Sequence, residues 1–270
     1  MMRKTCLAYG SFESVHKGHL EIAETVVALA KENGLKSAII SIPNTEENFT
    51  TEEEKEFLFK QVGVEAFLTC EKIDVEELLR VFDVKVLVVG ETCCNLEEVK
   101  RMAQVVGVEV VVVPTVMADG DVITLERVRT AYEKSDYEEI TKLCGHPYML
   151  IGEVVHGKAL GRTEKMPTAN LQIPEGKIKP LEGVYCTRVR LGDEMLKTVT
   201  NVGRRPTVDD FNYATIETLI LDFDRDIYGQ KLVLEVHKYI RDVRKFANLS
   251  EVKQQIDKDI QTVEAYFKTT

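Results

Sequence analysis

Residues 5–33 read TCLAYGSFESVHKGHLEIAETVVALAKEN, and this stretch decides the fold of the first half of the chain. It begins with a short apolar run, Thr5–Gly10, which is a strand candidate. From His19 to Asn33, apolar residues then recur at helical spacing. They are Leu20, Ile22, Ala23, Val26, Val27 and Leu29. A strand followed at once by such a helix is the repeating unit of α/β sheets.

The same alternation of apolar runs and helical patterns continues to Pro114. Further strands are expected at Ser37–Ile42, Glu65–Cys70, Val84–Val89 and Val108–Val113, and helices at Glu52–Val62, Val75–Phe82 and Leu96–Val106. Continuous apolar strands bounded by helices predict a parallel sheet that is covered on both faces. Because crossovers between parallel strands are right-handed, we expect a doubly wound α/β domain over residues 1–145.

The pattern changes after Ile123. Leu125–Leu143 is helical and rich in charge, and residues 144–147 are typical of a turn. Short β-rich segments follow, separated by Gly, Pro and Asp: Tyr148–Val155, Gly183–Val189, Lys197–Val202, Ala214–Leu221 and Leu232–Tyr239. Five or six such strands predict a small antiparallel β-barrel. An amphipathic helix, Leu249–Phe267, closes this second domain, which we expect at residues 146–270.

The length and charge of the chain limit what it can be. Its 270 residues are about 1.8 times the length of a typical domain, which agrees with two domains. Asp and Glu total 45 against 35 Lys and Arg, so the net charge is −10. Such a balance excludes a broad nucleic-acid surface but leaves room for a local patch that binds a small anion.

The sequence also bears on location and on redox chemistry. No run of apolar residues approaches the about 18 that span a bilayer, and residues 1–12 hold too short an apolar run for a signal peptide. The six cysteines lack C-x-x-C spacing, which argues against a disulfide framework and a zinc site. The vicinal Cys93 and Cys94 are read as ordinary reduced thiols rather than a redox pair. We expect a cytoplasmic protein with no membrane partner, and we make no prediction of its oligomeric state.

The first candidate site lies where the first strand leads into its helix. Here Phe12, His16, Gly18 and His19 stand at the carboxyl end of a strand and the start of a helix, where parallel sheets bind ligands. His16 and His19 can direct ring N–H groups at phosphate oxygens, and Gly18 removes a side chain where a ligand must approach. In isolation, H-x-G-H is more often a helix start with two solvated histidines. Its position after the first strand favours a function, and it resembles the motif of the nucleotidyltransferase superfamily.

The second constellation consists of several motifs in a fixed order. They are residues 152–162 (GEVVHGKALGR), 166–171 (MPTANL), 183–185 (GVY), 201–207 (NVGRRPT), 216–223 (IETLILDF) and 226–229 (DIYG). Each motif alone has an ordinary explanation as a turn or a solvated strand, but their joint order does not. Residues 146–270 closely resemble riboflavin kinase. The first half resembles the FMN adenylyltransferase module that is fused to this kinase in bacterial bifunctional FAD synthetases.

The chemistry of the second motif set agrees with phosphoryl transfer. Thr168 and Asn170 stand two residues apart, so both side chains point to one side of an extended segment. Hydroxyl and amide oxygens are hard ligands suited to Mg²⁺ that carries triphosphate oxygens. Glu217, in a β-like run, can accept the proton of a primary alcohol that attacks the γ-phosphorus. The resemblance assigns the same roles to these three residues.

The resemblance also implies the contacts to ATP and flavin. Gly157 and Gly161 flank a short loop that can cradle phosphates with backbone N–H groups, and no P-loop motif is present. We expect the ATP phosphates to contact five residues: Gly157, Gly161, Arg162, Pro167 and Thr168. Arg241 and Phe246 remain from the motif R-x-E-x-K-F and suit an aromatic ring system, so we expect flavin binding there.

The two halves depart from the family patterns to different degrees. In the second half, Lys165-Met166 replaces Gly-Phe and Val243 replaces a Glu. In the first half four elements are altered, at Glu13-Ser14, residues 42–45, residues 90–95 and residues 124–129. A carboxylate at Glu126 would repel triphosphate oxygens. These changes predict reduced, altered or absent adenylyl transfer, while Phe12, His16, Gly18, His19, Arg127 and Arg129 keep nucleotide binding open.

We therefore expect a riboflavin kinase that transfers the ATP γ-phosphate to the 5′-hydroxyl of riboflavin and gives FMN. Its partners are the small molecules ATP and riboflavin, with Mg²⁺ or a similar divalent ion as cofactor. One alternative is a fully bifunctional synthetase that also adenylylates FMN to FAD. Another is a flavin- or nucleotide-sensing regulator without turnover. The presence of Thr168, Asn170 and Glu217 together favours catalysis over sensing.

Overall fold

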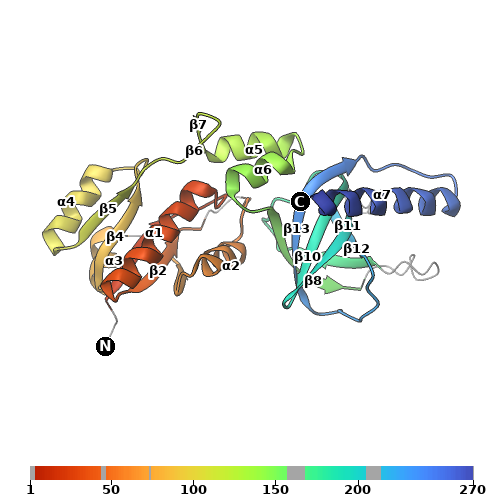
Figure 1. The fold of residues 1–270 in the computed structure, drawn as a ribbon. Coiled ribbons are helices and arrows are strands. Elements are labelled where there is room, and N and C mark those ends of the chain that lie inside the picture. Colours follow the sequence, from red (N-terminus) through yellow and green to blue (C-terminus); the bar gives the residue numbers. More distant parts are fainter. Residues whose placement is uncertain (1–3, 44–46, 73, 157–167, 205–213, 270) are drawn as a thin grey trace. The chain divides into compact units, whose positions relative to one another are not determined.

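The chain folds into two compact units in a computed structural model (Figure 1). The structure describes residues 4–43, 47–72, 74–156, 168–204 and 214–269. The first unit comprises Met1–Val128 and Leu143–Gly145, and the second comprises Arg129–Lys142 and His146–Thr270. Residues 129–142 thus fold with the second unit although they precede residue 145 in the chain.

A five-stranded parallel sheet forms the first unit, with the strand order β3-β2-β1-β4-β5. The strands are β1 (Thr5–Gly10), β2 (Lys36–Ser41), β3 (Ala66–Thr69), β4 (Val84–Gly90) and β5 (Glu109–Val113). The helices between them are α1 (Lys17–Asn33), α2 (Glu52–Val62), α3 (Val75–Val81) and α4 (Leu96–Val106). Strand order reverses between β1 and β4, so the predicted doubly wound α/β domain is confirmed.

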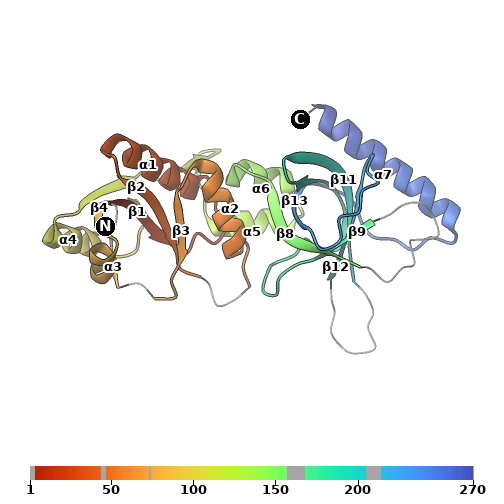
Figure 2. The same ribbon diagram turned by 90° about the horizontal axis from the view of Figure 1, so that it is seen from below.

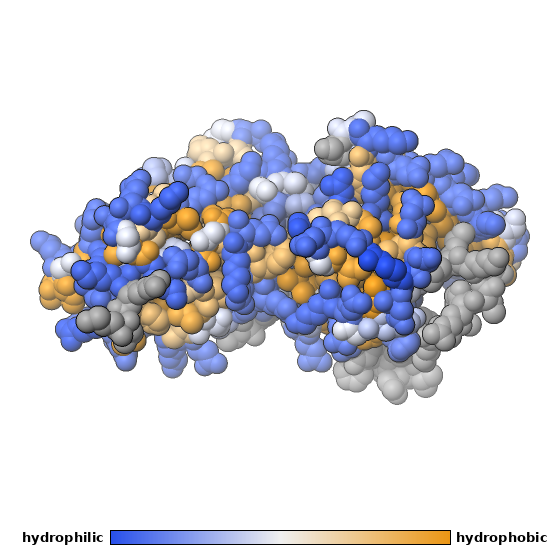
Figure 3. Space-filling view, turned by 60° about the horizontal axis from the view of Figure 1, so that its bottom comes forward, coloured by the Kyte–Doolittle hydropathy of each residue, from blue (hydrophilic) through white to orange (hydrophobic). Residues whose placement is uncertain are grey.

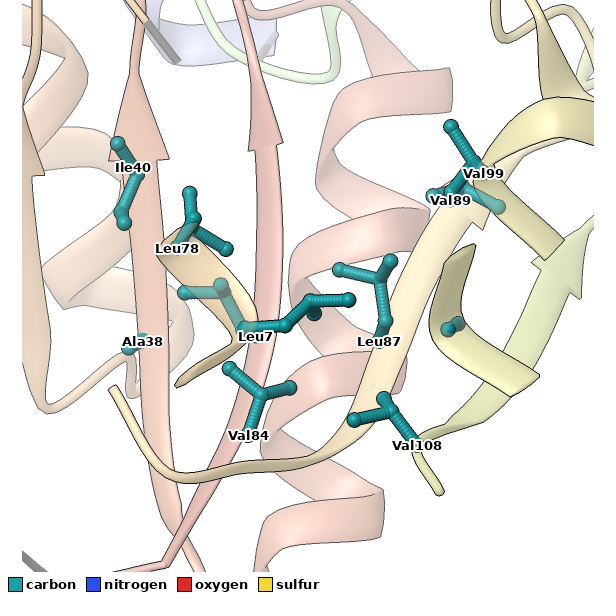
Figure 4. Packing of buried hydrophobic residues seen from close by; sticks show 11 residues of the cluster. Leu7, Ala38, Ile40, Leu78, Val84, Leu87, Val89, Val99 and Val108 are labelled. Carbon is teal, nitrogen blue, oxygen red and sulfur yellow. The ribbon is translucent and has the colours of Figure 1, made fainter. Parts of the chain in front are cut away.

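Both faces of this sheet are buried, which explains why its strands are continuously apolar. On one face, Leu7 and Leu87 pack with Leu78 of α3 and with residues of α4 (Figure 4). On the other face, the alternate strand residues Cys6 and Val86 pack with residues of α1. The strands thus expose their carboxyl ends, rather than a face, to ligands.

Two local features were not expected from the sequence. The predicted helical stretch 125–143 is two helices, α5 (Leu125–Glu133) and α6 (Tyr137–Cys144). Ser135 between them has a left-handed φ of 54°, and the Asp136 carboxylate accepts the backbone N–H of Glu139 at 2.9 Å, which starts the second helix. A small hairpin, β6 (Met117–Ala118) and β7 (Asp121–Val122), turns at Asp119-Gly120, both with positive φ.

A closed six-stranded antiparallel barrel forms the core of the second unit, as predicted (Figure 2). Its strands are β8 (Tyr148–Val155), β9 (Thr168–Gln172), β10 (Gly183–Leu191), β11 (Glu194–Arg204), β12 (Ala214–Ile220) and β13 (Lys231–Arg241). They close in the order β10-β11-β12-β9-β8-β13. The barrel leaves no open sheet edge. Strand β9 was not among the expected strands, because its five residues hold only two inward apolar side chains, Ala169 and Leu171.

Four buried threonine side chains lie inside the barrel and form a chain of hydroxyl contacts. Thr187 contacts Thr198 and Thr200 at 2.6 and 2.7 Å, and Thr200 contacts Thr218. Because buried hydroxyls need partners, this chain favours one strand register over its neighbours. A shift by one residue would turn these hydroxyls outward and the outer side chains inward.

Helices cover parts of the outer barrel surface. The last helix, α7 (Leu249–Thr269), packs Val263 and Phe267 against Val184, Cys186 and Val199 of β10 and β11. Helix α6 packs through Tyr137, which makes edge contacts with Tyr148 and Tyr185 at centroid distances of 5.8 and 5.4 Å. The segment 129–142 is therefore part of the packed structure of the second unit.

The spread of hydrophilic residues over the surface agrees with the chain's content of charged residues, 30%. In the space-filling view, hydrophilic residues are spread over the molecule and hydrophobic residues form patches between them (Figure 3). Among the helices that the structure describes, none is long and apolar enough to cross a bilayer.

Candidate functional site

The loop between β1 and α1 holds two buried residues in a conformation that side chains other than glycine rarely adopt. Phe12 and Val15 have φ angles of 47° and 40°. The Phe12 ring meets His19 edge-on at 5.3 Å and Phe59 at 5.1 Å. Burial of both residues maintains this strained loop. Phe12, a predicted site residue, therefore packs directly against one histidine of the pair, His19.

His16 and His19 lie together at the start of α1. Their rings stack at a centroid distance of 3.8 Å with an angle of 16°. Nδ1 of His16 accepts the backbone N–H of Gly18 at 3.1 Å, so His16 is the N-cap and carries its ring proton on Nε2. A Cβ atom at Gly18 would lie 3.0 Å from Cε1 of His16. Gly18 thus makes room for the His16 ring.

Both histidines are neutral at physiological pH. Burial lowers the pKa of His16 from 6.5 to about 4. Burial, helped by His16 and by the positive charge of Lys55, holds the pKa of His19 well below 6.5. Nδ1 of His19 is buried and has no hydrogen-bond partner among the described residues. The pair therefore offers N–H donors rather than positive charge to a ligand.

A buried lysine, which was not predicted from the sequence, lies beside this pair. Lys55 of α2 is fully buried, and its Nζ contacts Oε1 of Glu52 at 2.6 Å and donates to Oγ of Ser41 at 3.3 Å. Glu52 in turn accepts from Oγ1 of Thr69 at 3.2 Å. Ser41 and Thr69 end β2 and β3. The capping box at Thr51 predicts where α2 begins, but it does not mark Lys55 as a buried residue.

The two arginines predicted for nucleotide binding have different surroundings. Nη1 of Arg127 donates to three backbone carbonyls of the β6–β7 hairpin, at 3.0–3.2 Å. These bonds tie the start of α5 to the hairpin. Arg129 is exposed on α5 and belongs to the second unit. Nucleotide binding by either arginine stays a prediction.

The altered segment after β4 has a structural partner. The Glu91 carboxylate accepts the backbone N–H of Thr115 at 3.1 Å and its hydroxyl at 2.8 Å. These bonds lower the pKa of the exposed Glu91. Glu91 thus joins the end of β4 to the segment after β5.

In the barrel, the predicted base and metal ligands lie on one face of the neighbouring strands β9 and β12, on the outer surface. Glu217 of β12 lies directly opposite Asn170 of β9, and Thr168 lies two residues from Asn170 on the same face. The neighbours of Glu217 in β12, Ile216 and Thr218, are buried inside the barrel. Glu217 and Asn170 are half-buried, and Thr168 is exposed. The three residues named from the sequence are therefore brought together.

This set of donors fits a hard divalent cation. Thr168 offers a hydroxyl oxygen, Asn170 an amide oxygen and Glu217 a carboxylate, which are the ligand types of Mg²⁺. Within the described ranges, no cluster of three His, Cys, Asp or Glu side chains forms a metal site. Because Mg²⁺ in proteins keeps several of its waters, a few side-chain oxygens are sufficient for this fit.

A cavity of about 210 Å³ lies beside Thr168. It is lined by Val154, Thr168, Ala169, Ile220 and residues 223–228. Tyr228 on its rim stacks on His156 at 3.7 Å, and Arg225 is held by Glu194 at 3.0 and 2.5 Å. The cavity thus combines an apolar floor with a polar rim, as small-ligand sites do.

Four of the predicted phosphate contacts cannot be located. Gly157, Gly161, Arg162 and Pro167 lie outside the described residues. Only Thr168 of that set is described.

The predicted flavin contacts are Arg241 and Phe246. Arg241 donates from Nε and Nη2 to the two carboxylate oxygens of Asp259 at 3.0 and 2.7 Å, and from Nη1 to the carbonyl of Asp242. Asp259 is only 2% exposed, so this pair ties β13 to α7. Phe246 is half-buried with the Arg244 guanidinium over its ring at 5.5 Å. Flavin binding by these residues stays a prediction.

Comparisons with known proteins agree with both units. The riboflavin kinase family model matches residues 144–267, and a cytidylyltransferase-like model matches residues 7–138. A bifunctional riboflavin kinase/FMN adenylyltransferase of Haemophilus influenzae is 36% identical over 152 residues, which are 56% of this chain and 49% of that protein. The proteins of the same name from Listeria monocytogenes and Escherichia coli K12 are 27% and 29% identical. These two matches cover 97% and 98% of this chain and 92% and 93% of those proteins.

One solved structure is similar over nearly the whole chain. It is described as a macrolide-efflux protein from Streptococcus pneumoniae and is 26% identical to this chain, with a TM-score of 0.80. The match covers 97% of this chain and 94% of that one. The likeness supports the fold described above.

Proposed function

The chain belongs to the family of bifunctional riboflavin kinase/FMN adenylyltransferases, and from this premise we propose that its second unit is an ATP-dependent riboflavin kinase. It transfers the ATP γ-phosphate to the 5′-hydroxyl of riboflavin and releases FMN. The observation that carries this proposal is the row formed by Glu217 opposite Asn170, with Thr168 on the same face.

Glu217 is the proposed general base. Its carboxylate accepts the proton of the 5′-hydroxyl while that oxygen attacks the γ-phosphorus, and the bond to the β,γ-bridging oxygen breaks to release ADP. Thr168 and Asn170 would hold Mg²⁺, which when bound neutralises charge on the triphosphate. The register of β12 against β9 supports this role, because it places the Glu217 carboxylate directly opposite Asn170, one of the residues that would hold the cation.

The nucleotide lies, in this proposal, along β9. Thr168 is both a predicted phosphate contact and part of the lining of the 210 Å³ cavity, so the nucleoside of ATP would occupy that cavity. The phosphates would then meet Gly157, Gly161, Arg162 and Pro167. Riboflavin would bind from the side of Phe246 and Arg241, with the planar face of the Asp259-bound guanidinium against the isoalloxazine ring.

Adenylyl transfer from ATP to FMN is the second candidate, for the first unit. The neutral donors His16 and His19 at the carboxyl end of β1 support it, because they can bind phosphate oxygens as the bond to pyrophosphate breaks. Against it stand the four altered elements and the use of the Arg127 guanidinium by the hairpin. A flavin- or nucleotide-sensing role without turnover is the third.

A single product assay separates these candidates. The protein is incubated with riboflavin, ATP and MgCl₂, and riboflavin, FMN and FAD are separated by chromatography. FMN alone supports the kinase, FAD adds the adenylyltransferase, and unchanged riboflavin rejects both in favour of the regulator. Glu217→Gln should lower FMN formation by about 100-fold or more, while the affinity for ATP stays within a few-fold. Normal turnover by that variant would reject Glu217 as the base.

A further inference from the structure

We propose that Asn201 is a positioning residue for Glu217 in the phosphoryl transfer. The inference rests on the proposed kinase function and extends it to Asn201 of β11, the first residue of the motif at 201–207, which has no role so far. In this proposal Asn201 donates its side-chain N–H to one oxygen of the Glu217 carboxylate when the substrates are bound, so that the other oxygen faces the hydroxyl that it deprotonates.

The strand register carries this inference. Asn201 of β11 lies directly opposite Glu217 of β12, which lies directly opposite Asn170 of β9. Directly opposite residues of antiparallel strands share a face, and their Cβ atoms are about 4.5–5.5 Å apart. A carboxylate thus stands between two carboxamides in one row across three strands. Each carboxamide is within the reach of a side-chain hydrogen bond to the carboxylate.

The residues around this row leave room for the pairing of Asn201 with Glu217. The diagonal positions on the flanking strands are Val199, Gly203, Thr168 and Gln172, and all are uncharged. A Cβ atom at Gly203 would lie 3.5 Å from Nδ2 of Asn201, so the absence of a side chain at Gly203 leaves the Asn201 carboxamide room to turn. The hydroxyl of Thr215 donates to the carbonyl of Gly203 at 3.3 Å and fixes that backbone.

Contacts inside the barrel hold the strands that carry this row in register. Thr200 and Thr218, the residues next to Asn201 and Glu217, are also directly opposite, and their buried hydroxyls contact each other. This contact opposes a slip between β11 and β12, because a slip would bury Glu217. Asn201 and Glu217 are therefore held opposite each other by a contact that neither of them makes.

The two carboxamides have separate tasks in this arrangement. Asn170 offers its amide oxygen to the cation, while Asn201 offers its N–H to the carboxylate. A carboxylate with one oxygen bound to a fixed donor can turn less, so its second oxygen spends more time in line with the hydroxyl proton. Loss of Asn201 should lower the rate of the bound complex more than substrate binding.

The experiment compares two variants that separate the donor from the shape. Asn201→Leu keeps the approximate volume and removes the N–H donor, whereas Asn201→Ser keeps a donor and loses volume. Steady-state rates of FMN formation are measured with the full chain, ATP and MgCl₂, together with the thermal unfolding midpoint. Gln172→Ala is the matched control, because it removes a carboxamide from the same face of β9 that is not opposite Glu217.

We expect Asn201→Leu to lower kcat by about 10- to 100-fold, with both KM values within about threefold of the wild type. Asn201→Ser should keep more kcat than the leucine variant, and Gln172→Ala should keep nearly all of it. If activity follows volume, with leucine at least as active as serine, or if kcat of the leucine variant is unchanged, the positioning role is wrong while the kinase stands. A wild type that makes no FMN overturns both.

Discussion

Helix α6 is expected to be essential for the barrel although it precedes the segment that matches the riboflavin kinase family, residues 144–267. Tyr137 on this helix is 1% exposed and packs edge-on against Tyr148 and Tyr185. Its neighbour Glu138 pairs with Lys238 of β13 at 3.1 Å. Upstream, the hydroxyl of Tyr132 donates to the carbonyl of Lys179 at 2.7 Å.

The perturbation is Tyr137→Ala. Removing a fully buried aromatic ring costs about 3–5 kcal/mol, because the transfer free energy is lost and a cavity remains. That is a large part of the about 5–15 kcal/mol by which domains are stable. For a unit of this size it corresponds to a fall of roughly 10–20 °C in the unfolding midpoint. The exposed ion pair between Glu138 and Lys238 adds little to this figure.

The assay is thermal inactivation of FMN formation by the full chain, which follows the second unit alone. Aliquots are heated in steps, cooled and assayed, and circular dichroism records the unfolding of the same samples. Lys142→Ala is the control on the same helix, since Lys142 is exposed and its pair with Glu139 is on the surface. If Tyr137→Ala and Lys142→Ala shift the inactivation midpoint equally, α6 does not stabilise the barrel and the reasoning is refuted.

Three further changes test other contacts. The pKa of His16 is lowered to about 4, so unfolding takes up a proton between pH 6.5 and 4. The free energy of unfolding should therefore fall as the pH is lowered from 6.5 towards 4. His16→Asn keeps an N-cap acceptor and should flatten that fall, as measured by urea titrations at several pH values. In Gly152→Ala a Cβ would lie 2.8 Å from the Gln172 carbonyl oxygen, and we expect a loss of about 1–3 kcal/mol in unfolding free energy and a lower kcat. Asp259→Ala leaves Arg241 without its carboxylate and should cost about 3 kcal/mol in the same measurement.

Periodicity was sufficient for most of the fold. The helices Glu52–Val62 and Leu96–Val106 have the predicted bounds, because capping residues and Gly63 or Gly107 mark their ends in the sequence. The break between α5 and α6 was missed, since a left-handed Ser135 carries no glycine signal. Strand β9 was missed as a strand because alternation over five residues is too short to distinguish from a loop.

A sequence motif does not show whether a charged side chain binds a ligand or stabilises the fold. Arg127 and Arg241 both occupy motif positions, yet the structure uses one guanidinium to hold a hairpin and the other to hold α7. Both guanidinium groups donate to oxygens of the chain itself, as they would donate to the oxygens of a phosphate or a flavin. Only coordinates distinguish a carbonyl of the same chain from the oxygen of a ligand.

A site residue can be found from local spacing only when its partners lie on its own strand. Thr168 and Asn170 share a face because they stand two residues apart, and that relation needs no tertiary information. Asn201 and Glu217 are 16 positions apart in the numbering, and their pairing depends on the register between β11 and β12. A register shifted by a single residue would place one of them inside the barrel. The buried threonines set that register, so the chemistry of the outer row depends on hydroxyls that no substrate touches.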